Sequence, residues 1–335
     1  MDLTEAEIQI LASLAVLKAR SREGSLDALE ERGDEYSIYK EDWSGAFESL
    51  IQKGLITATA NGFLATDTGH PIGELYRAER PDMYWYHYQR LYTAGLASEA
   101  HSELCRRVFG ADLCQDGQTD MDALEHLMEL LGLKAGDKVL DLGCGAGVIA
   151  EYLSDVTGAE VIGLDFSQTA IDAANDRTAY KRAQMRFLVG NFNALDFEGV
   201  SFDAVVSLDT LYWAADLTTV VAKLLRILKP KGRMGIFMNH HIGPTDPPNM
   251  LNVEHSSLAV SLSQLGKDFE THNYTKEIGE FWKRNCEAAE ELLPRYTEEG
   301  NAFIGENLIR ESKEEYLPDI KAKRIARYLY FVQKS

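Results

Sequence analysis

The stretch KVLDLGCGAGVIAEYL, residues 138–153, decides the fold of this 335-residue chain. Residues 138–142 form a short, mainly apolar run that is typical of a buried strand, and three glycines follow it in the turn 143–147. Apolar side chains then recur at helical spacing over 148–153. A strand, a tight glycine turn and a helix form the nucleotide-binding corner of a doubly wound sheet, so the sequence predicts an α/β fold.

The glycine turn also carries information about its ligand. Its spacing is GxGxG, and the third glycine of a dinucleotide fingerprint would fall on Val148. Asp141 lies two residues before the first glycine, where its carboxylate would repel a pyrophosphate but would suit an ammonium or sulfonium group. These observations favour a cationic nucleoside ligand. A turn that only joins a strand to a helix is the alternative.

Further strands are expected along the chain. Glu160–Asp165 is the second strand, and it ends on an acid that can accept hydrogen bonds from both hydroxyls of a ribose. The remaining strands are expected at Met185–Gly190, at Phe202–Leu208, from about Met234 to Met238, at Phe269–Tyr274 and at Arg327–Val332. Because helices alternate with most of these strands, we expect a seven-stranded, mostly parallel sheet.

Four segments occur in a fixed order within residues 120–240: VLDLGCGAG, VIGLDFSQTAIDAA, FDAVVSLDTLYW and LLRILKPKGRMGIF. In these segments the chain resembles the class I S-adenosylmethionine-dependent methyltransferases. The resemblance implies S-adenosylmethionine as the cofactor and S-adenosylhomocysteine as the product. It gives as cofactor-binding residues Asp141, Gly143, Cys144, Gly145, Gly147, Asp165, Phe166, Asn191, Phe192 and Asp209.

The resemblance also assigns parts of the cofactor to some of these residues. The glycines would line its methionine part, Asp141 would face its amino group and Asp165 would hold its ribose. Asn191 stands where the family usually has Asp against adenine, but Asn keeps an acceptor oxygen, so adenine binding is expected to survive. Phe192 would offer its backbone and ring to the adenine. Cys144 is interpreted as a small turn residue rather than a nucleophile.

Two histidines are candidates for the general base. His240 and His241 follow the fifth expected strand, at the edge where the carboxyl ends of the strands meet the site. Their ordinary pKa lies near neutrality, which suits proton transfer, and a packing role is the alternative for either. A metal is not expected, because Asp209 is the one evident oxygen ligand near the fourth strand.

Aromatic residues are the other substrate-side candidates. Tyr84, Tyr88 and Tyr92 share one helical face, which predicts either a core stripe or rings that surround a cation. Tyr212 and Trp213 follow the fourth strand and are expected to face the same pocket. The predicted acceptor is a small molecule, with an amine favoured over a hydroxyl or a thioether. The predicted catalytic residues are Tyr88, Tyr212, His240 and His241.

The chain is expected to have three parts. Residues 1–78 read as helices followed by a hairpin at Asn61-Gly62, which resembles a winged-helix module. Residues 79–118 form an aromatic helical bridge, and residues 119–335 form the methyltransferase domain, with a helical cover at about 241–326. The first 80 residues hold eight basic and fifteen acidic residues, so dimerisation is favoured over DNA binding, and we expect a homodimer.

Charge and composition exclude several classes of protein. Lys and Arg number 34 against 53 Asp and Glu, a net charge of −19, which disfavours nucleic acids and anionic membranes as partners. Four scattered cysteines and an acidic N-terminus without a signal-peptide pattern predict a cytoplasmic protein. A transcriptional regulator that senses the cofactor is the second function considered, and a nucleic-acid methyltransferase is the third.

Overall fold

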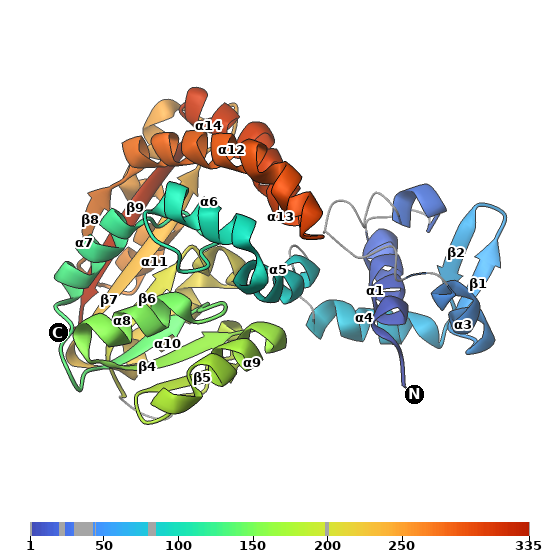
Figure 1. Ribbon diagram of the computed structural model, residues 1–335, viewed down its shortest axis with the longest axis horizontal. Coiled ribbons are helices and arrows are strands. Elements are labelled where there is room, and N and C mark those ends of the chain that lie inside the picture. Colours follow the sequence, from blue (N-terminus) through green and yellow to red (C-terminus); the bar gives the residue numbers. More distant parts are fainter. Residues whose placement is uncertain are drawn as a thin grey trace. The chain divides into compact units, whose positions relative to one another are not determined.

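The computed structural model describes residues 2–19, 24–29, 43, 45–79, 85–197 and 201–334. The chain forms two compact units, residues 1–91 and 92–335, each taken here by itself (Figure 1). The boundary between them falls inside the segment 79–118. Tyr84 lies outside the described residues. Among the described residues no helix is both long enough and apolar enough to cross a membrane.

The N-terminal unit consists of helices and one hairpin. Its core includes Leu11, Trp43 and Leu50, all buried. β1 pairs antiparallel with β2, from Ile56↔Ala65 to Thr59↔Gly62. The elements are α1 (Glu5–Ala19), α3 (Ala46–Gln52), β1 (Ile56–Thr59), β2 (Gly62–Ala65), α4 (Gly69–Glu79) and the first part of α5 (Trp85–Ala97). Helices followed by a hairpin are the order that the sequence indicated, and the winged-helix resemblance stays a prediction.

The C-terminal unit contains the predicted seven-stranded sheet, in the order β5-β4-β3-β6-β7-β9-β8. β3 to β7 are parallel, and β9 runs antiparallel to both of its neighbours. The strands are β3 (Lys138–Leu142), β4 (Glu160–Asp165), β5 (Met185–Val189), β6 (Phe202–Leu208), β7 (Leu228–His241), β8 (Glu270–Asn273) and β9 (Ile325–Gln333). The fold class expected from the sequence is therefore confirmed.

β7 corrects one boundary. The sequence placed the end of this strand at Met238, with both histidines after it, but the strand continues to His241. The reason is its neighbour β9, which stays paired with it as far as His241↔Ile325 and so supplies backbone hydrogen-bond partners. His240 and His241 are therefore strand residues with opposite side-chain directions.

Both faces of the sheet are covered by helices. Alternate residues along the strands, such as Leu140 and Met238 on one face and Val139 and Phe237 on the other, belong to two separate buried clusters. α10 (Leu217–Ile227) and α11 (Ser257–Gln264) cover the first face. α7 (Met121–Leu131), α8 (Val148–Thr157) and α9 (Gln168–Arg177) cover the second.

A helical cover joins β8 to β9. It consists of α12 (Thr275–Glu298), α13 (Ala302–Arg310), the π-helical turn Glu311–Tyr316 and α14 (Leu317–Lys321). α12 lies beside α6 (Glu99–Phe109), as Figure 1 shows in orange and cyan. The two helices are antiparallel, because Phe281 contacts Phe109 near one end and Tyr296 contacts His101 near the other.

The interruption of this cover at Glu299-Gly300 has a structural role. Gly300 has φ +74°, a conformation that suits glycine and ends the helix. The Glu299 carboxylate accepts hydrogen bonds from the Ala100 backbone N–H at 3.0 Å and from the Ser98 hydroxyl. Because these groups lie at the start of α6, the carboxylate caps that helix and ties it to the end of α12.

Candidate active site

The glycine turn after β3 has a backbone that only glycine fits well. Gly143, Gly145 and Gly147 have φ of +76°, +52° and +70°. A Cβ on Gly147 would lie 2.3 Å from the Phe187 ring, so a side chain there would also clash. The Gly143 N–H donates to the Leu164 carbonyl at 2.7 Å, which fixes the turn against the end of β4. The turn is thus a preformed stretch of backbone at the carboxyl end of β3.

Asp165, at the end of β4, is bonded directly to this turn. Its Oδ2 accepts from the Gly145 N–H at 2.9 Å, and its Oδ1 accepts from the Ser167 N–H at 2.9 Å. Burial raises the pKa of the Asp165 carboxyl, while these backbone donors act in the opposite direction. The Phe166 backbone N–H acts on the pKa in the same way, so the carboxylate already has three backbone donors and retains one acceptor position for a hydroxyl group. Phe166 lies between Asp165 and Ser167 in the chain.

Asp141 and Cys144 are the other ionisable groups at the turn. Asp141 is 3% exposed, and burial together with the charge of Asp165 raises its pKa to about 7. The Asp141 carboxylate has no hydrogen-bond partner among the described residues. Burial and the same acids raise the pKa of the Cys144 thiol well above its ordinary value, so the thiol stays protonated at neutral pH.

Tyr92, from the middle of α5, lies on the glycine turn. A Cβ added to Gly145 would be 2.6 Å from Cε1 of the Tyr92 ring, so the two residues are in close contact. Burial raises the pKa of Tyr92, and the nearby Asp165 raises it further. Tyr88 belongs to the N-terminal unit, where its ring lies 5.4 Å from that of His87. Of the predicted tyrosine stripe, the structure thus brings Tyr92 to the turn.

Asn191 and Phe192 follow β5. The Asn191 side chain caps a short 3-10 turn, because its Oδ1 accepts from the Asn193 N–H at 2.9 Å. Asn193 in turn accepts from the Ala215 N–H at 2.8 Å, which joins this loop to the one after β6. Phe192 packs against the buried cluster on the α10 face of the sheet. The Asn191 side chain is exposed, and its oxygen is already used within the loop.

Asp209, predicted as a cofactor residue, is held by five internal donors. It follows β6 with φ +55°. Both guanidinium NH groups of Arg327 donate to it, one to Oδ1 and one at 2.9 Å to Oδ2. The Gln118 N–H at 2.9 Å and the Thr119 hydroxyl at 3.3 Å donate to Oδ2, and the Tyr212 hydroxyl donates to Oδ1 at 3.1 Å. The carboxylate therefore has little capacity left for a cofactor.

Arg327 is the residue that sequence reasoning missed. It is 2% exposed and lies in β9, a strand that the apolar pattern alone had indicated. Besides Asp209 it donates to Asn239 Oδ1 at 3.0 Å and to the Thr119 hydroxyl at 2.9 Å. Its guanidinium carbon also lies 4.9 Å from the centre of the Phe237 ring. Removing one partner from a buried ion pair of this kind costs about 3–5 kcal/mol.

Tyr212 is a member of this network and not a free acid or base. Its hydroxyl donates to Asp209 and accepts from the Asn239 N–H at 2.8 Å. Burial and the charge of Asp209 raise the pKa of the Tyr212 phenol well above its ordinary value. The hydroxyl thus fixes the turn after β6 against the end of β7.

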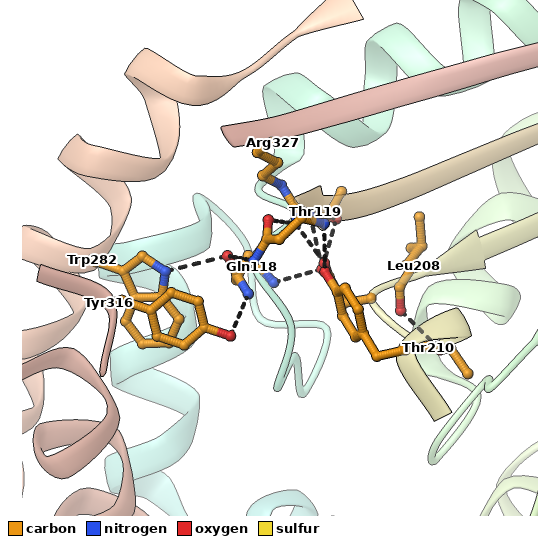
Figure 2. Close-up of polar contacts among 10 residues, drawn as sticks. Gln118, Thr119, Leu208, Thr210, Trp282, Tyr316 and Arg327 are labelled. Carbon is orange, nitrogen blue, oxygen red and sulfur yellow. Dashed lines mark hydrogen bonds and ion pairs between the residues drawn. The ribbon is translucent and has the colours of Figure 1, made fainter. Parts of the chain in front are cut away.

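Gln118 connects the network to an aromatic wall formed by Trp282 and Tyr316. Its Oε1 accepts from Asn239 Nδ2 at 3.0 Å and from Trp282 Nε1 at 3.2 Å, and its Nε2 donates to the Tyr316 hydroxyl at 3.1 Å. The Trp282 and Tyr316 rings are stacked with centroids 3.8 Å apart and planes 11° apart. Figure 2 shows Gln118 between this pair and Arg327.

The two histidines lie on opposite faces of the sheet. His240 Nε2 is 2.7 Å from the Met250 carbonyl oxygen, on the same face as Met238. His241 Nδ1 is 3.6 Å from Asp319, and its ring centroid is 6.3 Å from that of Tyr316 in the cover. Burial lowers the pKa of His241, and Asp319 acts to raise it. His241 is therefore the histidine beside the aromatic wall, and the pair does not converge on one point.

A metal site is not apparent in the part of the chain that the structure describes. No group of three or more His, Cys, Asp or Glu side chains among those residues is arranged to hold a metal ion. Asp209 is neutralised by Arg327 instead.

Comparisons with known proteins give the family of the central segment. Residues 139–232 match the family described as "Methyltransferase domain". A sterol 24-C-methyltransferase of Gibberella zeae is 32% identical over 142 residues, which are 42% of this chain and 36% of that protein. The methyltransferase GfsG of Streptomyces halstedii is 34% identical over 114 residues, which are 33% of this chain and 41% of that protein. The chain thus spans well under half the length of these relatives.

Solved structures support the fold. Phosphoethanolamine N-methyltransferase 2 of Haemonchus contortus has a TM-score of 0.55 at 20% identity, over 74% of this chain and 60% of that one. The [4+2]-cyclase SpnF has a TM-score of 0.55 at 19% identity, over 72% of this chain and 95% of that one. Because one of these is described as a cyclase, the fold by itself does not fix the reaction.

Proposed function

We propose that this chain, which contains a class I S-adenosylmethionine-dependent methyltransferase domain, transfers a methyl group from S-adenosylmethionine to a small-molecule acceptor. The observation that carries the proposal is the glycine turn with one buried carboxylate on each side of it, Asp141 and Asp165. The acceptor would attack the methyl carbon in line with the bond that breaks. The protein's part is to align the two molecules and to exclude water.

The residues around the turn fit the cofactor. Asp141 is a buried carboxylate without a hydrogen-bond partner among the described residues, and the ammonium of a methionine moiety would supply one. Asp165 lies at the turn and retains an acceptor position for a ribose hydroxyl. Asn191 and Phe192 lie beyond the next strand, where the adenine would bind. When bound, S-adenosylmethionine supplies an electrophilic methyl group on a positively charged sulfur.

We favour an amine as the acceptor, with a hydroxyl or a thioether as the alternative. The support is the aromatic side chains beside the polar network, Trp282 and Tyr316, whose π-faces attract cations. His241 lies next to this pair and would take a proton from an alcohol. The names of the similar proteins include carbon and nitrogen methyltransferases, so the family alone leaves the acceptor atom open.

Replacing Asp165 tests the cofactor site. Asp165→Ala should weaken S-adenosylmethionine binding by at least tenfold, because the ribose loses a charged acceptor worth about 1.5–3 kcal/mol per bond. Asp172→Ala is the control, since Asp172 is an exposed acid of the adjacent helix α9. Titration calorimetry measures both variants. Equal affinities for wild type and Asp165→Ala would contradict the assignment.

Binding of the cofactor should also depend on the protonation of Asp141. Because its pKa is about 7, the carboxyl becomes neutral as the pH falls below 7 and then loses its attraction for an ammonium group. Affinity should therefore fall between pH 7 and pH 5.5, by up to tenfold per unit, with release of a proton on binding at pH 6.

The control for this pH dependence is Asp141→Asn. Since the amino group of the ligand titrates as well, the relevant quantity is the difference between wild type and variant. That difference should shrink as the pH falls. If the affinity of Asp141→Asn follows the same pH curve as that of the wild type, Asp141 does not bind the ammonium group of the cofactor.

We further propose that the protein is a homodimer paired through its N-terminal unit. The support is four large apolar side chains that are exposed there: Leu26, Ile51, Leu64 and Leu75. Light scattering should give the mass of two chains for the wild type, and Leu75→Lys should shift it toward one. Val156→Lys, at an exposed apolar site of the other unit, should leave the mass unchanged. A monomeric wild type refutes the proposal.

A further inference from the structure

The loop between α6 and α7 holds one acidic residue, Asp116, in a fixed position. On one side, the Gln115 side chain accepts from the Leu113 N–H at 2.8 Å. On the other side, Gly117 is so close to Asp209 that a Cβ on it would lie 2.9 Å from the carboxylate. The next residue, Gln118, is bonded to Asp209 through its backbone N–H. The backbone around Asp116 is therefore anchored on both sides.

The Asp116 side chain itself has no such anchor. It is half-buried, and no described residue forms a hydrogen bond or an ion pair with its carboxylate. In the chain it lies between Cys114, whose Sγ would be 3.2 Å from a Cβ on Gly95 of α5, and Gly117 beside Asp209. Its charge raises the pKa of Tyr92 and of Tyr296, and burial, followed by the charge of Glu311 from the cover, raises the pKa of Asp116 itself well above the ordinary value. A partly buried carboxylate without a cationic partner among the described residues is destabilised, and a cationic ligand would offset that cost.

Asn285 is a second polar group without a partner in the same region. It is 1% exposed, and neither its Oδ1 nor its Nδ2 forms a hydrogen bond with any residue that the structure describes. On α12 it follows Trp282 by one turn, and Tyr296 lies three turns further on the same face. Trp282 contacts Gln118 and Tyr296 contacts His101, so this face of α12 is directed at α6 and the loop that follows it.

An unpartnered buried amide is rare in native proteins and costs about 1–3 kcal/mol. A ligand that brings both a donor and an acceptor would satisfy it. Asn285 and Asp116 are on segments that face each other, α12 and the loop after α6. Together they provide an anionic and a neutral polar group on the two segments that Gln118 and Trp282 join.

We propose that Asp116 binds the nitrogen of an amine acceptor and takes its proton, while Asn285 holds a second polar group of the same molecule. This inference rests on the proposed methyl transfer and specifies its substrate class. The amine enters as an ammonium ion, and one proton passes from its nitrogen to an Asp116 oxygen. The nitrogen keeps the electron pair that would form the new bond to the methyl carbon, while the carbon–sulfur bond would break with its pair on sulfur and S-adenosylhomocysteine would leave. The proton on Asp116 would pass to water as the products leave. An acid with a raised pKa is suited to this exchange, because its proton affinity is closer to that of an amine.

The test is a panel of primary and secondary amines, each paired with the alcohol of the same skeleton. Release of S-adenosylhomocysteine is measured for the full chain. The amines should react and their alcohol counterparts should not. In Asp116→Asn the KM for the best amine should rise at least tenfold, while the affinity for S-adenosylmethionine stays unchanged. Asp116→Glu should recover part of the loss, since it restores the carboxylate.

Asp112→Asn is the matched control, because Asp112 is an exposed acid of the same loop. Its KM should stay within about twofold of the wild-type value. An unchanged amine KM in Asp116→Asn, or equal turnover of the alcohols, overturns the inference. A protein that binds S-adenosylmethionine but methylates no amine also overturns it. A protein that does not bind S-adenosylmethionine at all refutes the proposed function itself, so the two failures are distinct.

Asn285→Leu separates binding from folding. Removing the unpartnered amide should raise the melting temperature of the unliganded protein, since a buried polar group without a partner is destabilising. The same change should raise the KM for the amine severalfold. A stabilised variant with an unchanged KM would show that Asn285 does not contact the acceptor.

Discussion

The buried ion pair between Asp209 and Arg327 is the interaction on which the acceptor side of the site depends. It joins residues 118 positions apart in the chain, at the ends of β6 and β9. Its remaining hydrogen bonds reach the start of α7 through Thr119 and the end of β7 through Asn239. Four segments are thus fixed around one carboxylate. Since the pair is almost fully desolvated, its strength depends on satisfying every donor and acceptor, which this network does for the Asp209 oxygens.

The two halves of the site are built in different ways. The cofactor side uses backbone: positive-φ glycines and one carboxylate, Asp165, that binds the turn through N–H groups. The acceptor side uses side chains from distant segments, with Gln118 bonded to Asn239, Trp282 and Tyr316. A backbone site suits a constant cofactor, and a side-chain site allows the acceptor to vary while the fold stays the same.

The sequence points to the two halves of the site to different degrees. The glycine turn, the acid that ends β4 and the positions of the strands along the chain follow from local spacing, which a sequence displays directly. The role of Arg327 does not follow from local spacing, because it lies in a strand of mainly apolar residues. Its partner, Asp209, comes after a different strand far away in the sequence. Asp209 was predicted as a cofactor residue, and its pairing with Arg327 carries no local signal in the sequence either. Asp116 and Asn285 carry no motif, and only their missing partners in the folded chain distinguish them.

Hydrogen exchange at the Gln118 amide tests the central claim most directly, because this N–H donates to Asp209 at 2.9 Å and reports on the anchored loop. The account predicts slow exchange in the wild type and at least tenfold faster exchange in Arg327→Met, with amides of β3 and β4 unchanged. Arg327→Lys keeps the charge but loses the bidentate contact with Asp209, so its exchange rate at Gln118 should be intermediate. Equal exchange at Gln118 in the wild type and in Arg327→Met would contradict the claim that this ion pair holds the acceptor side together.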